Sequence, residues 1–384
     1  MSSVRDTKTF NRTTQFAEGW YWALPSRALR RGKVAPVQLM GRDLAIYRGR
    51  SGRVVAVDAH CPHMGAHLAE GRVDGDALRC FFHGWRFEPD GVCSDAPQLE
   101  QPPRACLRTW PTTERHGLIW VWTGAEPKLP APCAPELEDL EVRWAHGNRF
   151  VKGTHPNVVM INAIDAHHFN TVHRLVVDLD FETTPKNAHV ITFANRTRVP
   201  TTRWLLRQIG RFYAGPLTYS MSYAYASSGT VTVGPDFLHC HILFALRMTP
   251  EGHTEGQTVL LTPRRRGPLG WLFDRIVLFA TKLVGNYFAK GDTRIFQTIK
   301  FDFQTPTKAD RSIIEFIRHA EEQPAVAWGT WAPVEATTER GAASERPAGR
   351  ALPLAEAPAP ASPGSERMTP EVGVARRAAE AVGA

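Results

Sequence analysis

Short runs of β-branched, aromatic and other apolar residues, separated by Gly, Asp and Pro, fill the first third of the chain. Within residues 19–122 the clearest runs span residues 44–47, 54–57 and 118–122. Apolar runs of this length between turn-forming residues are typical of β-strands, so the pattern predicts a small all-β domain. Residues 124–139 are rich in Pro and Glu and predict a linker or a crossing between domains.

The pattern changes beyond residue 139, where a helical stretch precedes segments that alternate between apolar and polar positions. The helical spacing covers about Val158 to His173, and the alternating segments span residues 190–199, 217–226, 237–248 and 257–262. One helix followed by several such strands predicts an α+β domain built on an antiparallel sheet.

Helical spacing returns near the end of this second region. One predicted helix runs from about Leu269 to Lys290 and another from about Thr307 to Glu322. Three charged residues interrupt the apolar stretch from Trp271 to Ala289. The stretch therefore predicts an amphipathic helix rather than a membrane span.

The composition changes again beyond Trp331, to Ala, Pro, Glu, Arg and Ser. Such a segment buries too little apolar surface to offset its ordering entropy, so we predict disorder. The predicted parts are an N-terminal extension (residues 1–18), an all-β domain (19–125), an α+β domain (126–325) and a disordered tail (326–384).

Composition and charge narrow the class of protein. The 384 residues are 43% hydrophobic and 22% charged, as in an ordinary globular protein with room for two domains. The first residues contain no apolar signal-peptide core, so we expect a cytoplasmic protein whose six cysteines are thiols or metal ligands. The net charge is +8, and because the tail from residue 333 holds six Arg and seven Glu, the body carries +9. A basic body suits an acidic protein partner, whereas nucleic acid is not expected, because no recognition motif is present.

Two short motifs each combine one cysteine with one histidine. Cys61 and His63 form the pattern C-x-H, and Cys80 and His83 form C-x2-H. A zinc site with two cysteines and two histidines more usually groups the cysteines in one arm and the histidines in the other. Mixed arms fit a [2Fe-2S] cluster in which both cysteines bind one iron and both histidines bind the other. We therefore favour an iron–sulfur cluster over zinc.

These motifs carry a family resemblance. The stretches CPHMGAHLAEGRVDGD, from Cys61, and RCFFHGWRFEPDGVC, from Arg79, resemble the Rieske domain of Rieske non-haem iron oxygenases. Within that family the chain is similar to the 3-ketosteroid 9α-hydroxylase and cholesterol 7-desaturase type, through His63-Met64-Gly65, Leu68, Gly71 and Gly75-Asp76. It departs from the family at Phe81, where Pro usually follows the second cysteine; Phe81 is not a ligand.

A second polar cluster comprises Asn162, Asp165, His168 and His173. Spacings of three residues place the first three on one helix face, whereas His168 and His173 would lie about 140° apart on a regular helix. Convergence on one metal therefore needs a distorted or π-type turn. Two imidazoles and one carboxylate form the facial triad of non-haem iron(II), and the pattern N-x2-D-x2-H-x4-H resembles the iron motif of the same oxygenases. His167 is predicted to point elsewhere.

The third iron ligand has to come from elsewhere in the chain. The candidates are Asp178, Asp180, Asp236, Asp274, Asp292, Asp302 and Asp310. We favour Asp292, because it follows the predicted long helix and its context, Asp-Thr-Arg-Ile-Phe, is similar to the D-x2-I-W stretch that carries the carboxylate in the ketosteroid hydroxylases. The alternative is a surface N-cap after Gly291.

The resemblance implies the cofactors, the fold and the partners. A [2Fe-2S] cluster would be held by Cys61, His63, Cys80 and His83. A mononuclear Fe(II), with O2 as cosubstrate, would be held by His168, His173 and Asp292. The second domain would have a helix-grip, or START-like, fold. The chain would form a head-to-tail homotrimer in which Asp165, the predicted catalytic residue beside Asn162, bridges His83 of one subunit to His168 or His173 of the next. No dinucleotide or flavin motif is present, so electrons would come from a separate ferredoxin or flavoprotein reductase.

The substrate class rests on weaker features. Large side chains at Tyr219, Met221, Tyr223 and Tyr225 share one strand face, which is either plain core or the lining of a substrate cavity. An apolar cavity suits a bulky, steroid-like molecule that is hydroxylated or desaturated; the alternative is an aryl amine or a natural-product intermediate. The three arginines at 264–266 form either a solvated loop or a contact with a membrane surface.

Two function classes other than an oxygenase compete with this interpretation. A Rieske electron carrier without catalysis leaves the second histidine pair and its large domain unexplained. A zinc-stabilised binding protein would be colourless, whereas a Rieske protein is red-brown.

Overall fold

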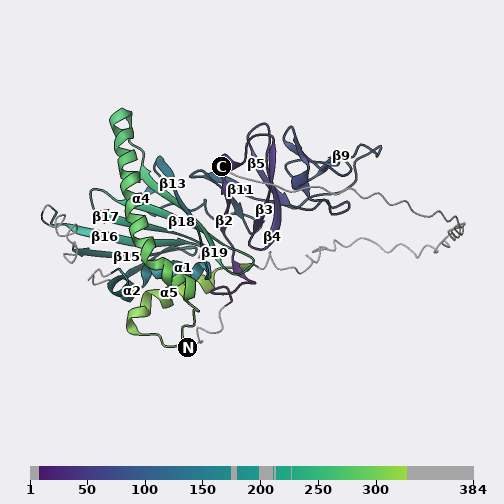
Figure 1. The fold of residues 1–384 in the computed structure, drawn as a ribbon. Coiled ribbons are helices and arrows are strands. Elements are labelled where there is room, and N and C mark those ends of the chain that lie inside the picture. The colour runs from purple at the N-terminus through teal and green to yellow at the C-terminus, as the bar shows by residue number, and fades with distance from the viewer. Residues whose placement is uncertain (1–7, 174–179, 199–210, 212, 226, 327–384) are drawn as a thin grey trace, which may run out of the picture. The chain divides into compact units, whose positions relative to one another are not determined.

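The first third of the chain consists of short antiparallel strands in three small sheets (Figure 1). The computed structural model describes residues 8–173, 180–198, 211, 213–225 and 227–326. The sheets have the orders β10-β5-β4-β3, β11-β12-β2 and β6-β7-β8-β9. Their strands are β2 Trp20–Pro25, β3 Lys33–Leu39, β4 Arg42–Arg48, β5 Val54–Asp58, β6 Arg72–Asp74, β7 Ala77–Arg79, β8 Arg86–Phe87, β9 Cys93–Asp95, β10 Thr109–Trp110, β11 Thr112–Arg115 and β12 Leu118–Trp122. The three predicted runs lie in β4, β5 and β12, which confirms the all-β prediction for this region.

The second region is built on a seven-stranded antiparallel sheet. Its order is β13-β19-β18-β17-β16-β15-β14. The strands are β13 Val142–Lys152, β14 Glu182–Asn187, β15 Val190–Arg198, β16 Pro216–Ala224, β17 Ser228–Pro235, β18 Cys240–Met248 and β19 Thr254–Pro263. The four alternating segments predicted from the sequence correspond to β15, β16, β18 and β19, whereas β13, β14 and β17 were not predicted. The α+β fold class is confirmed.

Helices cover one face of this sheet. The long helix α4, Gly267–Thr298, contacts β13, β18 and β19, and α5, Arg311–Glu322, contacts β15 (Figure 1). The shorter helices are α1 Pro156–Ile161 and α2 Ala166–Thr171, and the 3-10 turns are η2 Ser26–Ala28, η3 Leu68–Glu70, η4 Pro135–Leu137, η5 Asn162–Ile164 and η6 Lys308–Asp310. An antiparallel sheet that packs around one long helix in this way is the predicted helix-grip arrangement.

The prediction for the end of α4 was wrong. The sequence predicted an end near Lys290 with Asp292 beyond it, but the helix continues to Thr298 and includes Asp292. Gly291 keeps helical backbone, since it is not among the glycines with the positive φ that commonly ends a helix.

The Pro- and Glu-rich segment that joins the two regions is packed rather than solvated. Ala131, Ala134 and Leu137 are buried in one apolar cluster with four tryptophans of β2 and β12 and with side chains of β18 and β19. The Trp20 indole Nε1 also donates to Leu129 O over 2.8 Å. The crossing is therefore held against both sheets through a shared core.

Two short strands near the two ends of the described residues pair with each other. Strand β1, Phe16–Ala17, pairs antiparallel with β20, Ala325–Val326. Residues 327–384 lie outside the described residues. The predicted disordered tail falls almost entirely there, and the predicted domain bounds stay predictions.

Candidate metal centres

Two similar loops present the Cys-x-His and Cys-x2-His motifs. Cys61 comes shortly after β5 and Cys80 directly after β7. The first loop closes with a hydrogen bond from Gly65 N to Cys61 O of 2.9 Å, and the second with one from Cys80 N to Trp85 O of 2.8 Å. Gly65 has a φ of +75° and Gly84, in the second loop, a φ of +74°, a conformation that side-chain-bearing residues rarely adopt.

The two loops place their cysteines inside and their histidines outside. Cys61 and Cys80 are 4% and 2% exposed, whereas His63 is exposed and His83 half-buried. The two imidazoles lie 4.6 Å apart between ring centroids, and His63 stacks on Trp85 at 4.4 Å. The donor set fits a cluster whose cysteine-bound iron is buried and whose histidine-bound iron is close to the surface.

The protonation of the cysteines is consistent with this interpretation. Burial, with a smaller contribution from the adjacent Cys80, raises the pKa of the Cys61 thiol to about 11. Thiolates are the iron-binding form of cysteine. A Cys61 thiolate in this position therefore needs the positive charge of a metal to replace its proton.

The segment that carries Asn162 and the second histidine pair is not one continuous helix. Helix α1 ends at Ile161 and passes through the 3-10 turn η5, after which Asp165 has an extended backbone and α2 begins. His168 lies in α2, and His173 lies just beyond its end at Thr171. The predicted distortion is therefore present, but it is a break at Asp165 and a helix end rather than a π-type turn.

This geometry brings His168, His173 and Asp292 together. The Nε2 atoms of the two histidines are 2.9 Å apart, and each lies 3.0 Å from Oδ1 of Asp292. Neighbouring ligand atoms on an octahedral ion with bonds of ~2.1 Å are about 3.0 Å apart. The three atoms thus have the separations of three adjacent ligands on one ion. Other described aspartates among the sequence candidates are not part of this group, and Asp178 lies outside the described residues.

The electrostatics of Asp292 favour a cation at this point. Burial is the largest single influence and raises its pKa, but hydrogen bonds and charge from His168 and His173 outweigh it and hold the pKa at about 2. The carboxylate therefore stays ionised although the Asp292 side chain is only 18% exposed. A divalent ion would satisfy this buried charge and both imidazole lone pairs.

Gly291 gives the ligand group the space that it needs. A Cβ on this residue would lie 3.2 Å from Cε1 of His173, tighter than ordinary van der Waals contact. The alternative of a surface N-cap at Asp292 is therefore not observed, because α4 continues through Gly291, whose backbone packs closely against an imidazole.

Asn162 and Asp165 both contact His168, in different ways. The Asn162 amide Nδ2 lies 3.1 Å from His168 Nε2, next to the ligand group. Asp165 instead caps α2, because its Oδ1 accepts a hydrogen bond of 3.1 Å from His168 N. His167 is exposed and takes no part in the ligand group, as predicted.

A mostly apolar cavity of about 510 Å³ opens beside the ligand group. His173, Asn162 and Asp292 are part of its lining. Apolar side chains from five strands of the large sheet form much of the rest, among them Phe150, Met221, Val231, Val233, Phe244 and Leu260. The volume and lining are those of a site for a hydrophobic small molecule.

The predicted aromatic face of β16 is only partly in this cavity. Tyr219 and Met221 line it, but Tyr223 is fully buried against Phe316 of α5, with ring centroids 4.3 Å apart. Tyr225 has a φ of +56° after the strand has ended, so the two-residue period no longer applies to it. The proposal that Tyr223 and Tyr225 face a substrate was therefore wrong.

Lys152 is a cavity residue that the sequence did not reveal. It is the last residue of β13, and its Nζ donates to Thr293 Oγ1 over 2.7 Å. Burial lowers its pKa, while Asp292 partly offsets that effect. The polar and charged residues of β13 hid its strand pattern, although Trp144, His146 and Phe150 keep a period of two.

Comparison with known proteins agrees with the cluster geometry. Residues 19–111 match the family described as the Rieske [2Fe-2S] domain. The chain carries a Rieske domain. Such a domain holds a [2Fe-2S] cluster, so the predicted cluster is confirmed in kind. The Rieske domain accounts for all of the small sheets except the strands from β11 onward.

Relatives that match this chain are named as oxygenases or a desaturase. The chain is 33% identical over 180 residues to a 3-ketosteroid-9-alpha-monooxygenase oxygenase component of Rhodococcus rhodochrous, covering 45% of this chain and 47% of the relative. It is 37% identical over 163 residues to a cholesterol 7-desaturase of Bombyx mori, covering 41% and 36%. It is 36% identical over 186 residues to aminopyrrolnitrin oxygenase PrnD of Pseudomonas fluorescens, covering 45% and 50%. The matched parts thus span half or less of these relatives, and the predicted resemblance is confirmed over that part.

The similarity of fold to a solved structure covers most of the chain. A crystal structure of dicamba monooxygenase bound to 3,6-dichlorosalicylic acid matches with a TM-score of 0.58 at 20% identity, covering 81% of this chain and 97% of that one. At this identity the likeness concerns the fold. Among the described residues, no helix is long and apolar enough to cross a membrane.

Proposed function

We propose that this protein is the oxygenase component of a Rieske non-haem iron oxygenase that hydroxylates or desaturates a bulky, steroid-like substrate. The observation that carries the proposal is the ligand group of His168, His173 and Asp292 at the wall of an apolar cavity, in a chain that also carries a Rieske domain. Electrons come from a separate ferredoxin or flavoprotein reductase. The names of the ketosteroid and cholesterol relatives support the substrate class.

The residues of the ligand group and of the cavity have different roles in the proposed reaction. His168, His173 and Asp292 would hold iron(II), which supplies the binding and reductive activation of O2. The apolar walls exclude water and orient the substrate beside the ligand group. Asn162, at the cavity wall and with its Nδ2 3.1 Å from His168 Nε2, offers an uncharged hydrogen-bond donor beside the ligand group. Tyr219 is locked in place, because its hydroxyl donates to Ala163 O over 2.7 Å.

The test is product formation by the red-brown protein with a surrogate ferredoxin and reductase. A panel of 3-ketosteroids, sterols and aryl amines is incubated and product masses are read. A steroid product that gains one oxygen or loses two hydrogens supports the proposal. No steroid conversion by a sample with both metals intact contradicts the substrate class.

A cavity-filling substitution sharpens this test. Val233 lines the cavity, and Val233→Phe is expected to raise KM or lower kcat/KM for the steroid at least about 10-fold, because the added ring occupies substrate volume. Val151→Phe is the matched control, since Val151 is 63% exposed and alternates with the cavity residues Phe150 and Lys152. Equal effects of the two substitutions would argue against this cavity as the substrate site.

A second substrate class is supported by one relative and one residue. Aminopyrrolnitrin oxygenase acts, by its name, on a compound with an amino group. Lys152 gives the cavity a polar end close to Asp292, which would suit a substrate with a polar substituent. Conversion of aryl amines but not steroids in the same panel would select this alternative.

We also propose that the chain forms the homotrimer implied by its resemblance. The support is a stripe on α4 that is half exposed or more at every position: Leu269, Leu272, Ile276, Phe279, Leu283 and Tyr287. These residues recur every three or four positions, so they form one continuous apolar face, which in a soluble protein marks an interaction surface. We call it the α4 stripe. The rim of the cluster loops, with Met64 and Phe82 exposed, provides a second surface for a neighbouring subunit or an electron donor.

Light scattering during gel filtration tests the assembly. The expected mass is three times that of the chain, and Ile276→Glu with Phe279→Glu is expected to reduce it to one chain, because two buried carboxylates oppose association. Arg275→Glu is the control, since Arg275 is exposed on the same helix beside Trp271. A wild-type monomer would contradict the trimer. If that monomer sediments with anionic vesicles, the stripe, with the adjacent arginines 264 and 266, is assigned to a membrane surface instead.

One of the three arginines before α4 has a different role from either predicted. Arg265 donates to Oδ1 of Asp274 over 2.8 Å, and Arg143 donates to Oδ2 over 2.9 Å. The Asp274 side chain is fully buried. Arg265 therefore helps to compensate a buried carboxylate, and Arg143 of β13, through the same Asp274, anchors the start of α4 to the sheet.

A further inference from the structure

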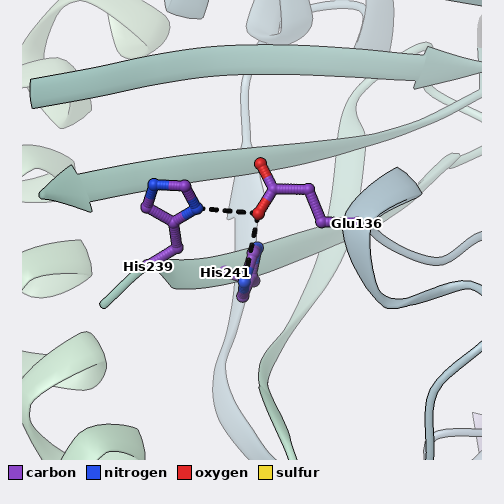
Figure 2. Close-up of side chains that lie close together, drawn as sticks. All are labelled: Glu136, His239 and His241. Carbon is purple, nitrogen blue, oxygen red and sulfur yellow. Dashed lines mark hydrogen bonds and ion pairs between the residues drawn. The ribbon is translucent and has the colours of Figure 1, made fainter. Parts of the chain in front are cut away.

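A second group of potential metal ligands lies where the crossing segment meets the large sheet. Figure 2 shows Glu136 of η4 with its carboxylate directed at the imidazoles of His239 and His241. Glu136 Oε2 lies 2.7 Å from His239 Nδ1 and 3.9 Å from His241 Nε2. One ligand atom from each residue lies within 4.8 Å of the other two. None of the three residues lines the apolar cavity.

The sequence pattern explains why the two imidazoles are on one side of the sheet. His239 directly precedes β18 and His241 is its second residue, and residues two apart on extended backbone point the same way. Glu136 is brought to them by packing, because its neighbours Ala134 and Leu137 are 0% and 1% exposed in the core under η4. The carboxylate is thus presented from a turn whose backbone is held in place.

A hydrogen bond at the other ring nitrogen orients His241. Its Nδ1 lies 2.9 Å from Oγ1 of Thr232, its partner across the β17–β18 pair, and both residues are 2% exposed. This contact fixes the ring and leaves Nε2 directed at Glu136. Metal-binding histidines almost always engage their second ring nitrogen in this way.

The charges in the group also favour a cation. His241 Nε2 and Glu136 Oε2 lie 3.9 Å apart, too far for a direct hydrogen bond between them. Within the described residues, the ion pairs of Glu136 are with these two histidines. A cation between these atoms would place a positive charge beside the carboxylate and engage the lone pair of His241 Nε2.

We propose that Glu136, His239 and His241 bind a Zn²⁺ ion, with solvent as the remaining ligand. Two imidazoles and a carboxylate are a ligand set that Zn²⁺ accepts, with bonds of ~2.0–2.2 Å, and atoms 2.7 and 3.9 Å apart bracket the separation of about 3.3 Å that tetrahedral ligands then have. The Glu136 side chain is 44% exposed, which leaves an open side for water. The ion would fasten the crossing segment, residues 124–139, to the start of β18.

The site is separate in place and role from the His168 group. It touches neither the cavity nor the cluster loops, so it contributes to stability rather than to turnover. The proposal does not depend on the proposed oxygenase function, because it concerns residues that the reaction does not use.

Zinc binding is measured on the holoenzyme with its cluster and iron in place. Protein is equilibrated with a small excess of Zn²⁺ and passed through a desalting column. Its zinc and iron contents are then measured by inductively coupled plasma mass spectrometry. Wild-type protein is expected to retain one more Zn²⁺ per chain than Glu136→Gln or His239→Gln, at unchanged iron content. His253→Gln is the matched control, because His253 is exposed and outside the group. The isosteric Glu136→Gln change is at an exposed side chain, so it keeps the fold even if His239→Gln does not.

Thermal unfolding gives an independent readout. Zn²⁺ at about 100 times its dissociation constant is expected to raise the Tm of wild-type protein and of His253→Gln by several degrees, and to leave Glu136→Gln nearly unchanged. Equal zinc retention by wild-type protein and both ligand variants would overturn the proposal. So would an equal Tm shift in all of them, because the zinc would then be bound elsewhere.

Discussion

His173→Ala is expected to reduce turnover by at least about 100-fold while leaving the absorption of the Rieske cluster unchanged. His173 Nε2 is one of three proposed ligand atoms, 2.9 Å from His168 Nε2 and 3.0 Å from Asp292 Oδ1. Without it, two ligands remain for an ion that the facial triad holds by three. The cluster ligands lie on separate loops of the Rieske domain, so their iron should be retained.

The measurement combines iron content, visible spectrum and product formation. The expected sample has the red-brown cluster, about one iron fewer per chain, and turnover at background. His167→Ala is the matched control, because His167 is exposed in α2, the helix just before His173, and lies outside the ligand group. If His173→Ala kept its mononuclear iron and its turnover, the proposed ligand group would be wrong.

Asp165→Asn is expected to retain both metals and the fold but to reduce turnover by about 100-fold. The Asp165 carboxylate caps α2 by accepting from His168 N over 3.1 Å. Asn is as good a cap as Asp, so the substitution preserves the local structure and removes only the charge. A bridging role between the cluster histidine of a neighbouring subunit and the iron ligands depends on that charge; a capping role alone does not.

The two roles of Asp165 are separated by a second substitution and a control. Asp165→Ala should lower stability by about 1 kcal/mol in addition, seen as a lower Tm, whereas Asp165→Asn should not. Asp236→Asn, which neutralises an exposed aspartate after β17, should leave turnover unchanged. Near-normal turnover of Asp165→Asn would mean that Asp165 is only a helix cap.

Several features were predicted correctly because they are local in the sequence. The runs in β4, β5 and β12 and the alternation in β15 and β16 depend on neighbouring residues, whose period identifies a strand. The Cys-x-His and Cys-x2-His arms are equally local. Each loop is a few residues long, so spacing alone restricts which metal centre it can build.

The errors lie where packing overrides the local pattern. The predicted helix was expected to end near Lys290, but α4 packs on β13, β18 and β19 and continues to Thr298. Tyr223 has the same strand phase as Tyr219, yet α5 covers it and turns a predicted cavity residue into core. Strand β13 was missed because its polar residues are stabilised by pairing with β19, which no pattern within β13 reveals.

The sequence by itself determined the two Cys/His motifs of the Rieske domain, the strand-rich first region and the fold class, since all of these depend on residues close together in the chain. Only the tertiary structure decided which aspartate joins His168 and His173, which side of β16 faces a cavity, and that Glu136 meets His239 and His241. Those outcomes depend on how helices and turns pack on the large sheet. Such packing is set by the summed burial of many side chains, so a short motif does not specify it.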